Sequence, residues 1–91
     1  MSTAAQRVAQ EVRRRAILAI LAFAPGQTAP VRSVRDQLES AHGQIVTVDR
    51  VRADLLWLAD VDAIECLGEL AKLTETGFDV VMGRAQLPGN A

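Results

Sequence analysis

The sequence has few of the residues on which catalytic and metal sites are built. It contains one cysteine, Cys66, and one histidine, His42, in 91 residues. One cysteine forms no intramolecular disulfide and no cysteine-rich zinc site, and one histidine leaves most metal clusters and catalytic triads incomplete. No nucleophile with its base, no pair of carboxylates and no phosphate-binding loop can be assembled. We therefore expect no enzyme, no metal and no other cofactor.

Aromatic residues and long apolar runs are also scarce. There is no tyrosine, and the only aromatic residues are Phe23, Trp57 and Phe78, which is too few for a platform that stacks single-stranded nucleic acid.

Three arginines precede the nine apolar residues 16–24, in the manner of a secretory signal. A bilayer span needs about 20 apolar residues, and Glu11 is unusual for a signal segment. We therefore expect a core helix here, in a cytoplasmic protein with no membrane contact.

Composition and charge indicate one small globular domain. Hydrophobic residues make up 49% of the chain and charged residues 23%, with a net charge of −1. Residues 1–52 carry eight arginines against four acids, whereas residues 53–91 carry two basic residues against seven acids. Such an asymmetry orients a molecule towards a phosphate backbone or towards a partner protein, and it does not choose between them.

The first half of the chain reads as two helices. Apolar residues recur at helical spacing over residues 3–23, and the second half of this stretch is apolar on every side. We expect such a helix to be central to the core or shared with another subunit, and we predict a homodimer through this helix and the last one. Pro25-Gly26 ends the helix and residues 27–30 form a connector. A second helix is predicted from Ser33, as N-cap, to Ala41, with Gly43 in the left-handed conformation after it.

The second half reads as a helix, a hairpin and a helix. Thr47 is the predicted N-cap of a third helix that ends near Val61. The period then changes to two, and Gly68-Glu69 fits a type II′ turn between strands at residues 64–67 and 70–73, with Ile64 and Cys66 pointing inwards. Thr74 is predicted to cap a last helix of about ten residues anchored by Phe78 and Val81. We expect a folded domain over residues 1–84 and a flexible tail over residues 85–91.

This order of elements, mainly α with a small β-hairpin, is that of a winged helix-turn-helix domain. Residues 51–64 resemble the junction between recognition helix and wing in bacterial winged-helix regulators, and Leu73–Gly77 resembles the L-T-x-x-G that follows the wing. More narrowly, residues 49–58 and 81–89 are similar to small proteins of Mu-like phages and prophages that are loosely labelled ArsR-like regulators. The resemblance covers about residues 10–90 and implies a transcriptional regulator that binds double-stranded DNA.

Two positions depart from that pattern. Asp62 stands where the resembling proteins have a glycine after the recognition helix, so we expect Asp62 to adopt a positive φ at some cost. The metal-sensing role that the ArsR-like label implies has no ligand set here, because the single cysteine and the single histidine lie far apart in the sequence.

Basic residues on the second and third helices and on the wing are the candidate contacts to DNA. Arg50 is placed to read guanine in the major groove beside Ala53 and Trp57, and arginines on both helices are placed to hold phosphates. The full set of predicted DNA-binding residues is Arg32, Arg35, Thr47, Arg50, Arg52, Ala53, Trp57 and Lys72.

Acidic residues weigh against DNA binding. Asp49 and Asp54 would repel phosphates, and the wing carries Glu65 and Glu69. The alternative is a protein-interaction module that kept the fold and acts in phage assembly or packaging. In that case Trp57 is the candidate contact, since exposed tryptophan often carries interface energy; otherwise its ring lies back on the first helix or the wing.

Overall fold

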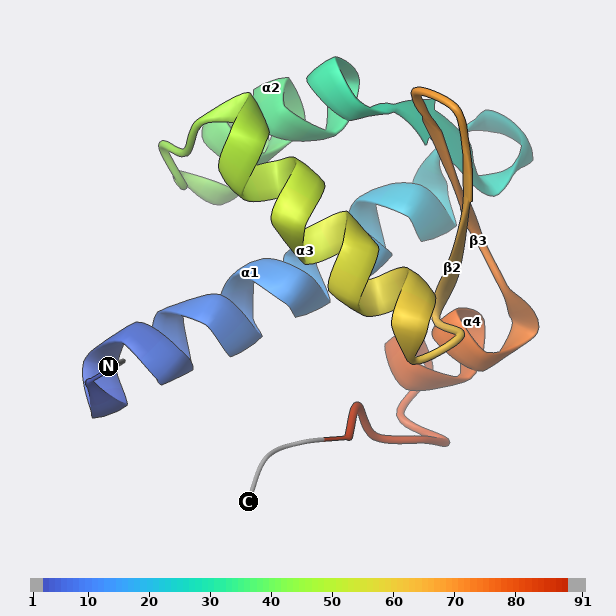
Figure 1. Ribbon diagram of the computed structural model, residues 1–91. Coiled ribbons are helices and arrows are strands. Elements are labelled where there is room, and N and C mark those ends of the chain that lie inside the picture. The colour runs from blue at the N-terminus through green and yellow to red at the C-terminus, as the bar shows by residue number, and fades with distance from the viewer. Residues whose placement is uncertain (1–2, 89–91) are drawn as a thin grey trace.

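The computed structural model describes residues 3–88, which form one layer of helices packed on a small antiparallel sheet (Figure 1). The elements in chain order are α1 (Ala4–Phe23), η1 (Pro25–Gln27), β1 (Thr28–Pro30), α2 (Val31–His42), α3 (Val48–Asp60), β2 (Ile64–Leu67), β3 (Leu70–Leu73) and α4 (Glu75–Val81). The expected order of helices and hairpin is confirmed, and one strand is added to it.

The second half of α1 is the centre of the core. Its side chains from Ala16 to Leu18, with Ile20 and Leu21, are buried by the rest of the same chain. The stretch is therefore central to the core, which is the first of the two placements that we expected. Apolar residues of α1 remain exposed at Val8 and Val12 in its first half and at Phe23, its last residue.

Helix α2 begins three residues earlier than predicted, and Ser33 is not its N-cap. Pro30 occupies that position and makes no side-chain capping bond. The backbone N–H of Val31 instead donates to the carbonyl oxygen of Glu69, at 3.0 Å, so the hairpin turn satisfies a donor that a capping side chain would otherwise take. The other end is as predicted, with Gly43 at φ 65°.

Helix α3 is bounded by the residues that the sequence indicated. The Thr47 hydroxyl accepts a hydrogen bond from the Arg50 backbone N–H at 3.1 Å, as an N-cap does. After the helix the chain turns at Asp62, whose φ is 62°, so the expected positive φ is confirmed. The backbone N–H of Ala63 then reaches back to the Leu58 carbonyl, and the hairpin starts.

The sheet has three strands, in the order β1-β3-β2. The predicted hairpin is confirmed, with Leu67 opposite Leu70 across the Gly68-Glu69 turn and a positive φ at Gly68. Strand β1 pairs with the other edge of β3, Ala29 opposite Ala71. We expected only a connector there, because three residues are too short for an alternating pattern to show.

Cys66 was expected to be buried beside Ile64, and this is wrong. The Cys66 side chain does lie towards α3, with its sulfur 3.9 Å from the Leu55 carbonyl oxygen, but the residue is exposed. It lies on the edge strand β2, whereas its partner Ala71 lies on the central strand β3 and is fully buried. Partial burial still raises the pKa of the Cys66 thiol.

Helix α4 is shorter than expected, with seven residues, and Thr74 caps it as predicted by accepting from the Gly77 backbone N–H. The anchors differ: Val80 and Gly77 are buried, whereas Phe78 and Val81 are half-buried. Gly77 lies so close to the preceding chain that an added Cβ would stand 2.0 Å from the Ala63 carbonyl oxygen.

The folded unit extends past residue 84, the boundary that we expected. Leu87 is 7% exposed and belongs to the hydrophobic core. The end of the expected tail, residues 89–91, lies outside the described residues.

Candidate nucleic-acid interface

The first half of α3 presents a polar face to solvent. Arg50 and Ala53 are exposed, as predicted, and Thr47 lies at the helix start with its hydroxyl engaged as the cap. Within residues 3–88 the Arg50 side chain has no ion-pair or hydrogen-bond partner. Arg50 is therefore available to a ligand, although Asp49 beside it is exposed as well.

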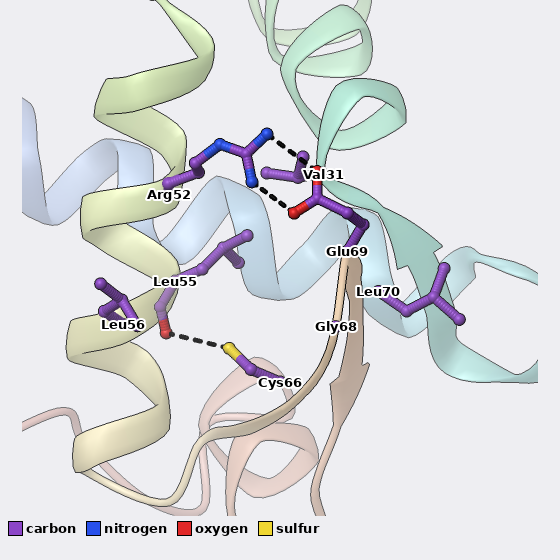
Figure 2. Close-up of a pocket in the computed structure, with 8 residues that line it drawn as sticks. All are labelled: Val31, Arg52, Leu55, Leu56, Cys66, Gly68, Glu69 and Leu70. Atoms are coloured by element: carbon purple, nitrogen blue, oxygen red, sulfur yellow. Dashed lines mark hydrogen bonds and ion pairs between the residues drawn. The ribbon is translucent and has the colours of Figure 1, made fainter.

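Arg52, a predicted phosphate contact, is engaged with the wing (Figure 2). Its guanidinium donates two hydrogen bonds to the Glu69 carboxylate, at 2.5 and 2.8 Å. These hydrogen bonds raise the pKa of Arg52 and lower the pKa of Glu69. The charge of Arg52 is thus compensated within the chain, at the turn where the wing meets α3.

Trp57 is not fully exposed, as the hypothesis of a protein-interaction module had assumed. It is half-buried, and the Arg14 guanidinium of α1 lies over its ring, 4.0 Å from the ring centroid. The structure therefore matches the alternative in which the ring lies back on the first helix. Trp57 flanks the outward face of α3 and does not lie at its centre.

Asp54 was read as an acid that repels phosphates, and this interpretation is wrong. Its side chain is 1% exposed and accepts hydrogen bonds from Arg13 and from Arg14 Nε, the latter at 3.2 Å. A buried carboxylate needs such partners, because burial without them is costly. Two arginines of α1 therefore fix α3 in place, and Asp54 presents no charge to a ligand.

The sequence contained a signal for this cluster that we did not use. Asp54 lies three residues after Val51 and four before Leu58, and both of these are fully buried. At about 100° per residue this places Asp54 on the buried face of α3. An acid on such a face requires a cationic partner, and the run Arg13-Arg14-Arg15 was the densest source in the chain.

The remaining predicted contacts differ in availability. Arg32 is exposed in the first turn of α2, and Lys72 is exposed on β3, between Thr28 of β1 and Glu65 of β2. Arg35 is half-buried, and its Nη2 pairs with the Asp36 carboxylate at 3.0 Å. Arg32 and Lys72 are thus the freer cations, and Lys72 lies on the exposed face of the sheet.

A shallow cleft of about 160 Å³ separates α3 from the hairpin turn (Figure 2). It is mostly apolar, and the Arg52–Glu69 pair spans one end of it. The residues that line it are Val31, Arg52, Leu55, Leu56, Cys66, Gly68, Glu69 and Leu70. Leu56 is 64% exposed and Leu70 41%, so this part of the face is apolar where the rest is charged.

In the part of the chain that the structure describes, no three side chains of histidine, cysteine or acid type gather as metal ligands. None of the helices over residues 3–88 has the length and apolar character to cross a bilayer.

Comparison with known proteins identifies the fold. No protein-family model matches the sequence, and no curated protein matches it. Two solved structures of RosR do match the structure. The complex hsRosR-S1 has a TM-score of 0.66 at 24% identity, over 77% of this chain and 64% of that one. The complex hsRosR-S4 has a TM-score of 0.66 at 21% identity, over 81% and 72%. The chain thus spans about two thirds of the RosR chains it matches, and its fold is the winged helix.

Proposed function

We propose that this protein is a winged-helix transcriptional regulator that binds double-stranded DNA through α3. The observation that carries the proposal is the free guanidinium of Arg50 on the outward face of α3. The fold shared with the regulator RosR supports it. The burial of Asp54 supports it as well, since one of the two acids that opposed DNA binding on α3 is neutralised by α1.

Each residue has a role that follows from its position. Arg50 donates to the O6 and N7 atoms of a guanine, and the methyl group of Ala53 contacts a thymine methyl in the same groove. Arg32 on α2 and Lys72 on β3 hold phosphates, and Arg35 supports them from α2. Arg52 joins them only where DNA displaces Glu69, and Thr47 acts by setting the start of α3.

The finer features of the proposal rest on the sequence. The similarity of residues 49–58 and 81–89 to proteins of Mu-like phages supports a phage or prophage origin and a place in the cytoplasm of the bacterial host. The exposed apolar residues of α1 support a homodimer through α1 and α4.

One observation favours a second function, that of a protein-interaction module. Leu56 and Leu70, which line the cleft between α3 and the hairpin, are 64 and 41% exposed, and Leu67, opposite Leu70, is 49% exposed. DNA phosphates gain nothing from such residues, whereas a protein partner buries them. The support for a partner therefore lies at these leucines, and not at Trp57, where we first expected it.

Binding to DNA that flanks the protein's own gene tests the first function. We expect fluorescence anisotropy to show binding that exceeds binding to a scrambled fragment of equal length. The affinity should fall as salt rises, with a slope of log K against log[salt] near −0.9 for each neutralised phosphate. If neither fragment binds at low salt, the regulator proposal fails and the interaction module replaces it.

A further inference from the structure

One face of α1 carries an exposed apolar stripe along nearly the whole helix. Val8, Val12 and Phe23 are 60, 52 and 88% exposed, and Ala19 between them is half-buried. At about 100° per residue these four side chains fall within one narrow sector of the helix. The first half of α1 extends away from the other elements (Figure 1). We call these four residues the α1 stripe.

A hollow opens beside the stripe where α4 packs on α1. It has a volume of about 120 Å³ and is lined by Arg15, Leu18, Ala19, Val80 and Val81. Met82, next to Val81, is 53% exposed. The stripe therefore runs from a projecting helix end, where nothing in residues 3–88 covers it, to an apolar recess in the body of the domain.

The order of residues in the stripe reads the same in both directions. The spacings between Val8, Val12, Ala19 and Phe23 are four, seven and four residues. When two copies of α1 lie antiparallel with the two-fold axis between Arg15 and Ala16, Val12 faces the partner's Ala19 and Val8 faces the partner's Phe23. Ala19 of each copy, the small residue at the recess, thus packs against the larger Val12 side chain of the other copy. Packed interfaces exclude voids in this way.

A parallel pair does not achieve this match. It sets each residue against itself, so that alanine meets alanine beside the recess and the recess stays unfilled. It also leaves the projecting half of each helix against the other projecting half, away from both domains. The antiparallel pair instead lays each projecting half over the body of the partner.

We propose that two copies of the chain dock antiparallel along the α1 stripe, with Val12 of each seated at the partner's recess between α1 and α4. This deepens the dimer of the proposed function by giving its orientation, its register and the residues that meet. The tests use no DNA, so their failure would leave the proposal of DNA binding standing.

Cysteine cross-linking tests the register. In a Cys66→Ser background, the double variant Val12→Cys with Ala19→Cys should form a covalent dimer on mild oxidation. The two positions lie about 10.5 Å apart along one helix, beyond the Cα separation of about 7 Å that a disulfide spans, so the link forms only between copies. Each single variant should stay monomeric on a non-reducing gel, because the antiparallel register separates like residues by the same distance. A covalent dimer of Val12→Cys alone would indicate parallel pairing and overturn the register.

Light scattering tests the interface without cross-links. The unmodified chain at tens of micromolar should show twice its mass of 9.8 kDa, and Val12→Arg should show 9.8 kDa alone. Ile45→Arg between α2 and α3, which makes the same change at another exposed apolar residue, should leave the dimer intact. Circular dichroism verifies that both variants are folded. A monomeric parent protein, or a dimer that Ile45→Arg abolishes and Val12→Arg does not, would refute the proposal.

Discussion

Arg52 and Glu69 join α3 to the turn of the wing through two parallel hydrogen bonds, at 2.5 and 2.8 Å. The same Glu69 accepts the first backbone N–H of α2 through its carbonyl oxygen. One residue of a two-residue turn therefore holds α2 and α3 at once. Glu69 thus holds the wing against the helix-turn-helix unit. It also pairs with the guanidinium of Arg52, which would otherwise be available to a phosphate.

The Arg52–Glu69 pair gives stability a defined dependence on pH. Its hydrogen bonds lower the pKa of Glu69 in the folded state. The stability that the pair adds is therefore complete above the unfolded value of about 4.3 and is lost as the pH falls through the lower folded pKa. Urea unfolding at pH 7 and pH 3 should show a gap between the parent and Glu69→Gln that narrows in acid. A gap of constant size at both pH values would contradict this account.

Loss of Asp54 should damage the fold far more than loss of the exposed acid Asp49. Asp54→Ala leaves Arg13 and Arg14, which are 11 and 14% exposed, without their carboxylate. Removal of one side of a buried ion pair costs about 3–5 kcal/mol, and chemical denaturation should show a loss of this size. Asp49→Ala, in the exposed first turn of α3, should cost less than about 1 kcal/mol.

The milder variant Asp54→Asn keeps the size of the side chain and provides the measurement if Asp54→Ala does not fold. It should fall between the parent and Asp54→Ala, because the amide oxygen still accepts a hydrogen bond. Equal stability of Asp54→Ala and Asp49→Ala would show that the two arginines do not depend on Asp54.

Features set by nearby residues were predictable from the sequence, and features set by distant contacts were not. Thr47 and Thr74 cap helices, and Gly43 and Asp62 take positive φ, because each is determined within a few residues. The start of α2 was missed because its first N–H is satisfied by Glu69, far along the chain. Strand β1 was missed for the same reason, since only pairing with β3 defines it.

The candidate site was predictable in its residues but not in their availability. Arg50 and Ala53 are exposed where the helical period placed them. Arg52 and Trp57 lie on the expected helix, yet each is engaged by a residue of another element, Glu69 of the hairpin turn and Arg14 of α1. Sequence periodicity gives the face of a helix, whereas the partner of a long side chain depends on how the elements pack.

Replacement of Asp62 by glycine should stabilise the protein. The φ of 62° at Asp62 costs an L-residue energy that glycine avoids, and the gain should be roughly 0.5–1 kcal/mol. The backbone atoms of Asp62 that bond Ala59 and Thr74 are kept. Ala53→Gly in the middle of α3 is the matched control and should cost about 1 kcal/mol. A lower melting temperature for Asp62→Gly than for the parent would show that the aspartate side chain is needed at this turn.

The functional prediction concerns two arginines that should act in different ways. Arg50→Ala should weaken binding to the preferred DNA by about 1–3 kcal/mol and relax the preference at one base pair, because its guanidinium reads a base. Arg32→Ala should weaken all sequences alike and lower the salt slope by about one, because its contact is to phosphate. Arg7→Ala removes the same charge from the exposed first half of α1 and should change neither quantity beyond a small long-range effect.

Anisotropy titrations of the three variants, on the preferred and scrambled fragments at two salt concentrations, separate these effects. The ratio of the two affinities reports base reading, and the salt slope reports phosphate contacts. If Arg50→Ala lowered both affinities equally, Arg50 would hold phosphate and another side chain of α3 would read the sequence. If Arg7→Ala weakened binding as much as Arg32→Ala, net charge and not the α3 face would account for the affinity.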